Sequence, residues 1–225
     1  VCDIMGVGPG TLNNWKAQLL KSLYKSAKSV LQDGSDKAGA KERVEEAKLK
    51  LVKKLGGTDG WPEPEMQAEL ERHYDTYWQG LDSRTHAVFA RLLKDIKATD
   101  FAADLEADED RAATRACFVL QDHPGIFSRL AGALSLVGAK VVDARTYTSK
   151  DGFGTAVFWV QDAEGNPYEV RRLPRLRDMI DKTLRGEVVA SRALEGRDKI
   201  KKRERPFAVP TNITFDNEGS EIYTI

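Results

Sequence analysis

Apolar residues recur every three or four positions along the first part of the chain, which is the spacing of one helical face. Thr11 can cap a first helix, and Gly34 can end it. The apolar face of this helix consists of Leu12, Trp15, Leu19, Leu23 and Val30. The next segment, 36–55, keeps the spacing but is polar at most other positions. The pattern therefore predicts a solvated helix on the protein surface.

Glycine and proline then interrupt the helical spacing. The stretch GGTDGWPEP at 56–64 predicts a loop. Two further helices are expected at 63–79 and 83–97, and Asp82 or Ser83 would cap the second.

The acidic stretch ATDFAADLEADED at 98–110 is weakly patterned, and it predicts a linker or an exposed edge. Strand-like and helical runs alternate after it. The expected strands are 112–120, 139–148, 153–161 and 207–215, and the expected helices are 125–137 and 171–185. Asp151-Gly152 is a strong hairpin signal, and Pro210 favours an edge position for the last strand.

This order of elements predicts the α+β class, with a helical N-terminal region followed by a ferredoxin-like βαββαβ domain. Two helices would cover one face of a four-stranded antiparallel sheet. The strand 153–161 is apolar on both faces, because Phe158 and Val160 alternate with Val157 and Trp159. One helical layer buries one face, so we expect the other face to meet a second copy or a neighbouring domain. A partly exposed Trp159 is the alternative.

Composition narrows the class of protein. The chain has 225 residues, with 35 Lys and Arg balanced by 35 Asp and Glu. Zero net charge gives no general attraction to nucleic acid or to membranes, and no apolar run approaches the roughly 20 residues of a membrane span. Cys2 and Cys117 lie in dissimilar settings and are expected to be reduced thiols in a cytoplasmic protein. Because it lacks an initial Met and closes on EIYTI, the chain is expected to be a fragment of something longer.

The junction Asp-His-Pro-Gly at 122–125 stands between an expected strand and an expected helix. Pro124 ends the strand and Gly125 permits the turn. The first N–H groups of the helix and its dipole favour a carboxylate, while Asp122 could hold an ammonium group. The pair suits the two charged ends of a free amino acid. The alternative is that Asp122 merely caps the helix.

The residues around this junction resemble a known family. DHPGIFSRLAGALSLVGAKVVDARTYTSKDGFGTAVFWVQDAEGNPYE is similar to an ACT domain, a module that binds amino acids in metabolic regulators. The likeness is closer still to the first ACT domain of the bifunctional PII uridylyltransferase/uridylyl-removing enzymes. RPFAVPTNITFDNEGSEIYTI resembles the following strand and the start of a second ACT domain. CDIMGVGPGTLNNWKAQLLKSLY resembles the end of the family's HD-type phosphohydrolase domain.

The resemblance implies a division of the chain into four parts. Residues 1–35 would end the HD-type hydrolase domain, and 36–110 would form a helical connector. Residues 111–217 would form the first ACT domain, and 218–225 would begin the second.

The resemblance also implies an activity for the longer protein. That protein would be a nucleotidyltransferase that passes UMP from UTP to the PII signalling protein when glutamine is low. It would also be a phosphodiesterase that removes UMP when glutamine is high. Its catalytic motifs are not found in this chain, so no catalytic residue is expected here. Mg²⁺ would serve the longer protein, and no cofactor is expected on this part. Asp3 matches one metal ligand of the HD domain, without the others.

Glutamine would then be the ligand of the ACT region. Its carboxylate would meet the N–H groups of Gly125, Ile126 and Phe127, next to Pro124, and its ammonium would meet Asp122. The following strand would read the side-chain amide, at Val142, Asp143 and Ala144 or from a paired ACT domain. Alternatively, Asp143 could simply be a charged residue at the edge of the sheet.

Two other interpretations remain. One is an ACT module of another metabolic enzyme or regulator. The other is a ligand-free ACT domain that serves docking or dimerisation.

Overall fold

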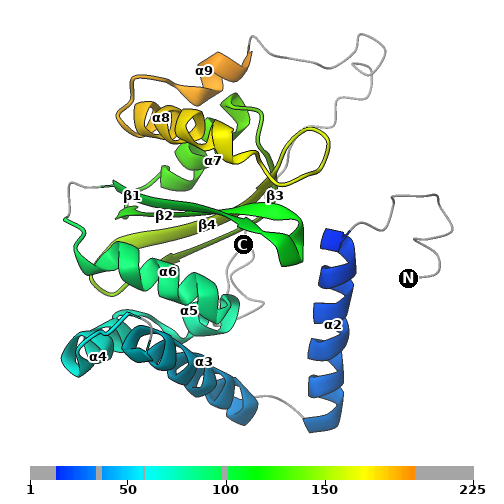
Figure 1. Ribbon diagram of the computed structural model, residues 1–225, viewed down its shortest axis with the longest axis vertical. Helices are drawn as coiled ribbons and strands as arrows, with labels where there is room; N and C mark the ends of the chain where they lie inside the picture. The colour runs from blue at the N-terminus through cyan, green and yellow to red at the C-terminus, as the bar shows by residue number, and fades with distance from the viewer. Residues whose placement is uncertain (1–13, 34–36, 58, 98–100, 196–225) are drawn as a thin grey trace, which may run out of the picture.

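The computed structural model describes residues 14–33, 37–57, 59–97 and 101–195. A four-stranded antiparallel sheet lies between two groups of helices (Figure 1). The α+β class with a helical region ahead of the sheet is therefore confirmed. Asp3, Cys2, the expected strand 207–215 and the segment 218–225 lie outside the described residues.

The sheet has the strand order β1-β2-β4-β3. Its strands are β1 (Phe101–Asp108), β2 (Ala113–Gln121), β3 (Lys140–Thr148) and β4 (Phe153–Gln161). The sequence left 98–110 open between a linker and an exposed edge, and the structure shows that β1 is an edge strand paired along its length with β2. The hairpin between β3 and β4, predicted at Asp151-Gly152, is confirmed.

Three helices lie on one face of the sheet (Figure 1). They are α7 (Ile126–Leu136), α8 (Leu173–Leu184) and the short α9 (Ala190–Glu195). The upper core, which we define as the apolar layer between the sheet and these helices, includes Phe118, Leu130, Phe158, Leu176 and Ile180. Helices α7 and α8 were expected from their periodicity, and both are confirmed.

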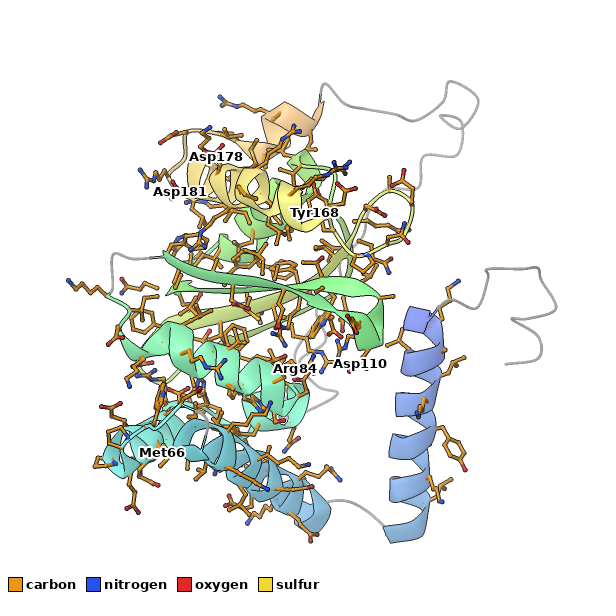
Figure 2. The ribbon with its side chains drawn as sticks, in the orientation of Figure 1. Met66, Arg84, Asp110, Tyr168, Asp178 and Asp181 are labelled. Carbon is orange, nitrogen blue, oxygen red and sulfur yellow. The ribbon has the colours of Figure 1, made fainter. Side chains whose placement is uncertain are left out.

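The opposite face of the sheet is covered by helices of the same chain (Figure 1). These helices are α3 (Lys37–Gly57), α4 (Glu63–Arg72), α5 (Asp75–Gly80) and α6 (Ser83–Lys94), while α2 (Asn14–Asp33) lies against the short 3-10 turn η1 (Glu109–Arg111). Helix α6 packs directly on β1 and β2. Figure 2 shows that side chains fill the space on both sides of the sheet.

The apolar second face of β4 therefore needs no second copy of the chain. Val157 and Trp159 belong to a lower core with Tyr77, Trp78 and Phe89 of the helices α5 and α6. Only 1% of Trp159 is exposed, so the alternative of a partly exposed Trp159 is wrong. The Trp159 ring also donates its Nε1–H to Asp108 Oδ2 at 3.0 Å, and the Arg111 guanidinium lies 3.9 Å from the ring centroid.

The helix at 37–57 is exposed at most of its polar positions, as predicted, and it buries Val44, Leu51 and Leu55 in the lower core. One expectation for the helical region is wrong. The expected helix 63–79 is two helices, α4 and α5, separated by extended backbone at His73 and Tyr74. No proline or glycine marks this break, which coincides with the burial of the His73 ring. Asp82 caps α6 as predicted, accepting from the N–H groups of residues 84 and 85.

His86 of α6 is a fully buried polar group in this lower core. Its Nε2–H donates to the Tyr77 carbonyl oxygen at 3.2 Å. Burial disfavours the imidazolium form and lowers the pKa of His86 from 6.5 to about 4, against the smaller opposing effects of the Tyr77 hydrogen bond and of Asp82. The folded protein therefore holds His86 neutral.

We predict that Phe89→Ala lowers the free energy of unfolding by about 3–5 kcal/mol, because it leaves a cavity under the sheet. Urea unfolding of the full chain measures this value. The matched control is Leu49→Ala, whose parent side chain is 69% exposed on α3 and should change stability by about 0.5 kcal/mol or less. A loss below about 1 kcal/mol for Phe89→Ala would mean that α6 does not pack on the sheet.

We predict that stability falls as the pH drops from about 6.5 towards 4. The unfolded chain binds a proton on His86 in this window and the folded chain does not, so acid favours unfolding by up to about 3 kcal/mol. Urea unfolding at several pH values measures the slope. His86→Gln should flatten it, whereas His123→Gln, which replaces an exposed histidine, should leave it unchanged.

Candidate functional site

The junction Asp-His-Pro-Gly lies where β2 ends and α7 begins. Gly125 has a φ of +88°, in the left-handed region, and it is the residue immediately before α7. This conformation is easy for glycine and costly for residues with a Cβ. Pro124 cannot donate a backbone hydrogen bond, which suits the end of the strand.

Asp122 does not cap α7. Its Oδ2 accepts a hydrogen bond from the Thr148 hydroxyl at 2.6 Å, and no side chain caps the helix at Gly125. The backbone N–H of Asp122 donates to the Gly152 carbonyl oxygen at 2.9 Å. Asp122 Oδ1 has no hydrogen-bond partner among the described residues and lies beside Gly154. The interpretation of Asp122 as a simple helix cap is therefore wrong.

The first N–H groups of α7 are only partly used. The Ile126 N–H donates to the His123 carbonyl oxygen at 3.3 Å. The N–H groups of Gly125 and Phe127 have no such partner within the described chain, so they are available to an anion. Available donors thus lie at one side of the junction and an available carboxylate oxygen lies at the other.

A cavity of about 220 Å³ opens at this junction. Its lining consists of Asp122, His123, Gly125, Ile126, Phe127, Thr146, Tyr147, Thr148, Gly154, Thr155 and Ala156. Phe127 is 47% exposed, and its ring stacks on Phe158 with 5.3 Å between centroids. The cavity therefore combines an acidic oxygen, backbone donors, threonine hydroxyls and an aromatic wall.

The structure gathers some of the expected site residues and not others. Asp122, Gly125, Ile126 and Phe127 line the cavity together, and Pro124 lies between them without lining it. Val142, Asp143 and Ala144 lie nearer the other end of β3 and do not line it.

The three residues on β3 point to different surroundings. Val142 lies at an irregularity in the pairing of β3 with β4 and packs against the lower core, whereas Ala144 packs against the upper core. Asp143 lies 3.8 Å from Arg111 and 3.7 Å from Arg145, as ion pairs. Asp143 is thus held among arginines, away from Asp122.

Thr146, Thr148 and Thr155 were missed from the sequence. The strand register brings them to the junction, since Thr148 pairs with Gly154 and Gln121 pairs with Phe153. The signal that could have found them is the alternation of two threonines, 146 and 148, just ahead of a hairpin that returns beside the end of β2.

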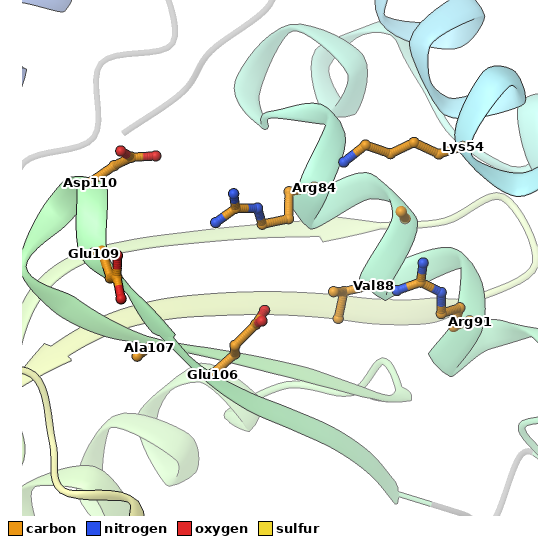
Figure 3. Close-up of a pocket in the computed structure, with 9 residues that line it drawn as sticks. Lys54, Arg84, Val88, Arg91, Glu106, Ala107, Glu109 and Asp110 are labelled. Atoms are coloured by element: carbon orange, nitrogen blue, oxygen red, sulfur yellow. The ribbon is translucent and has the colours of Figure 1, made fainter. Parts of the chain in front are cut away.

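A second hollow lies between α6 and the β1–η1 segment (Figure 3). It measures about 480 Å³, with Lys54, Arg84 and Arg91 on the helical side and Glu106, Glu109 and Asp110 on the other. Part of this charge is already paired, because Arg91 Nε lies 2.9 Å from Asp59 Oδ2 and Glu106 Oε2 lies 2.6 Å from Arg115 Nη2. Positive and negative walls balance, so the hollow selects no single charge.

Within the described ranges, no group of three or more His, Cys, Asp or Glu side chains could hold a metal ion, and no helix is long and apolar enough to cross a membrane. Cys117 is free and buried, and burial raises the pKa of its thiol well above the usual value, so it is unreactive.

The whole chain is similar to known proteins. The chain is 62% identical over 225 residues to the bifunctional uridylyltransferase/uridylyl-removing enzyme of Cereibacter sphaeroides, and the match covers all of this chain and 24% of that protein. It is 57% identical to the enzyme of the same name from Ruegeria pomeroyi, covering all of this chain and 25% of that protein. For the Rhodospirillum rubrum enzyme of that name the identity is 34%, over 99% of this chain and 24% of that protein.

No family model matches the chain. The chain spans about a quarter of the length of these relatives, and its predicted resemblance to the bifunctional uridylyltransferase/uridylyl-removing enzymes is confirmed.

We predict that Gly125→Ala lowers the free energy of unfolding by about 1–2 kcal/mol, because alanine is strained at this φ. Gly57→Ala is the matched control, since it lies at the end of α3 with open space around it. Urea unfolding compares the two. Equal stabilities would show that residue 125 does not adopt the left-handed turn.

Proposed function

We propose that this chain, which matches the bifunctional uridylyltransferase/uridylyl-removing enzymes from end to end, is their glutamine-sensing regulatory part. The observation that carries the proposal is the pairing, at one 220 Å³ cavity, of the available Asp122 Oδ1 with the available N–H groups of Gly125 and Phe127. A free amino acid carries the complementary pair of charges.

The ligand would lie across the junction. Its carboxylate would accept from the N–H groups of Gly125 and Phe127, where the α7 dipole favours negative charge. Its ammonium would donate to Asp122 Oδ1. The side-chain amide would then meet the hydroxyl of Thr146, which lines the cavity and replaces Val142, Asp143 and Ala144 in this proposal.

The activity of the longer protein belongs to the same proposal. It would transfer UMP from UTP to the PII protein with Mg²⁺ and remove it by hydrolysis, in the bacterial cytoplasm. Bound glutamine would favour one arrangement of the longer protein over another. The ligand can shift that equilibrium only by its difference in affinity for the two arrangements.

A docking role is the second candidate function. Strand β3 is at the edge of the sheet, so its outer backbone groups are open to another strand within the described part of the molecule. Pairing of two ACT domains through β3 would use this edge. It is compatible with a ligand at Asp122, because the cavity lies at the end of the strand.

We predict that glutamine binds the full chain and that Asp122→Asn weakens the binding by about 10–100-fold. This factor corresponds to the loss of one charge-assisted hydrogen bond, about 1.5–3 kcal/mol. Isothermal titration calorimetry measures the affinity. Glutamate, which lacks the side-chain amide, should bind more weakly.

Asp181→Asn is the matched control, since Asp181 forms an exposed ion pair on α8 away from the cavity, and it should not change the affinity. Absence of glutamine binding at millimolar concentration would contradict a sensing role for this part of the protein.

A further inference from the structure

We propose that the β3–β4 hairpin, residues 148–152, transmits occupancy of the Asp122 site to the break between α4 and α5. In this inference Thr148 is the residue that positions the hairpin relative to Asp122. It rests on the proposed function, because glutamine at Asp122 is the signal.

The hairpin is tied to Asp122 at both of its ends. The Thr148 hydroxyl donates to Asp122 Oδ2 at 2.6 Å, and the Asp122 N–H donates to the Gly152 carbonyl oxygen at 2.9 Å. A ligand ammonium on Asp122 Oδ1 therefore acts on the same carboxylate that holds Thr148. A small reorientation of this carboxylate must change the Thr148 contact.

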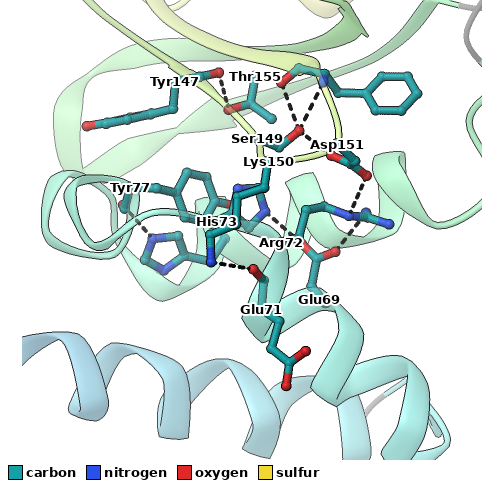
Figure 4. A network of polar contacts seen from close by, with 12 residues as sticks. Glu69, Glu71, Arg72, His73, Tyr77, Tyr147, Ser149, Lys150, Asp151 and Thr155 are labelled. Carbon is teal, nitrogen blue, oxygen red and sulfur yellow. Dashed lines mark hydrogen bonds and ion pairs between the residues drawn. The ribbon is translucent and has the colours of Figure 1, made fainter.

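The turn itself is held by its own hydrogen bonds (Figure 4). The Ser149 N–H donates to the Phe153 carbonyl oxygen at 2.8 Å, and the Phe153 N–H donates to Ser149 Oγ at 3.0 Å. Ser149 Oγ also donates to Asp151 Oδ1, and the Gly152 N–H donates to the Ser149 carbonyl oxygen. The residues of the turn are thus expected to move together.

Lys150 and Asp151 of the hairpin contact the C-terminal end of α4 (Figure 4). The Lys150 N–H donates to the Arg72 carbonyl oxygen at 2.9 Å, and Lys150 Nζ donates to the Glu71 carbonyl oxygen at 2.8 Å. Asp151 Oδ2 lies 3.1 Å from Arg72 Nε. Carbonyls at the end of a helix have no partner inside the helix, so the hairpin supplies the partners for α4.

From Arg72 the contacts continue into the lower core. Arg72 Nη1 donates to Glu69 Oε2 at 2.8 Å, and His73 Nε2 lies 3.1 Å from Glu69 Oε1. The His73 ring stacks on Tyr77 of α5 with 3.7 Å between centroids. Glu69 is 2% exposed and pairs with Arg72, so moving Arg72 away would leave a buried carboxylate without that partner and is costly.

The path therefore runs from Asp122 through Thr148 and the turn to Arg72, and then to Glu69 and His73. His73 lies at the break between α4 and α5, where the backbone is extended. Coupling energies between sites are typically about 1–3 kcal/mol, which corresponds to factors of about 5–150. A change of this size in the amide exchange rates of residues 69–78 is measurable.

Hydrogen exchange of the full chain, with and without saturating glutamine, tests the inference. In the unsubstituted chain, glutamine should change the amide exchange rates of residues 69–78 by about 5-fold or more. Thr148→Val removes the hydroxyl and keeps the shape. Because Thr148 lines the cavity and holds Asp122, this variant should bind glutamine about 5-fold or more weakly, and when saturated with glutamine it should lose the change at 69–78. Thr183→Val, which removes a hydroxyl on α8, should keep both the affinity and the change.

A second measurement approaches the path from its other end. Asp151→Asn weakens the contact with Arg72, and linkage requires that it change glutamine affinity by the coupling factor, about 5-fold or more. Asp162→Asn is the matched control in the turn after β4 and should leave the affinity unchanged.

The outcomes separate the two proposals. Glutamine binding without any change at 69–78, or a change that survives in Thr148→Val, would overturn the inference and leave the proposed function standing. If the unsubstituted chain does not bind glutamine, the proposed function is overturned, and the inference with it.

Discussion

The burial of β2 and β4 on both faces is the constraint on which the rest of the structure depends. Phe118 and Phe158 face one layer of helices, and Val157 and Trp159 face the other. A ferredoxin-like sheet with helices on one side only would leave a large apolar surface in water. Helices α5 and α6 remove that surface, so the helical region is part of the core rather than an attachment to it. This arrangement also fixes the geometry of the candidate site, because the junction follows the central strand β2 and the hairpin leads into the central strand β4.

Much of the fold could be predicted from the sequence because its strongest signals are local. The strands β2 and β4, the helices α7 and α8 and the cap at Asp82 follow from periodicity and turn chemistry. The edge strand β1 gave a weak signal, since its residues are half-exposed and acidic and do not alternate cleanly. The break at His73 gave none, because it depends on tertiary contacts of a buried ring and not on proline or glycine.

The candidate site was predictable on one side of the cavity only. Asp122 and Gly125 could be found because an acid, a proline and a glycine between a strand and a helix are typical of a binding turn. The opposite wall was missed, because it depends on pairing across the sheet and its local signal, two threonines ahead of the hairpin, is weak. The irregular pairing at Val142 displaces the register of β3, so that Thr148 contacts Asp122 and Thr146 lines the same cavity.

The lower core has a consequence for the kind of motion that the molecule can make. Trp78, Phe89 and Trp159 interlock there with nearly no exposed surface, and this interface joins the helical region to the sheet. Close-packed interfaces resist opening, because separation would expose apolar area, whereas small sliding of packed elements costs little. The two layers are therefore suited to shear and not to hinge rotation. A signal that crosses this interface would appear as displacements of an ångström or so, spread over several side chains.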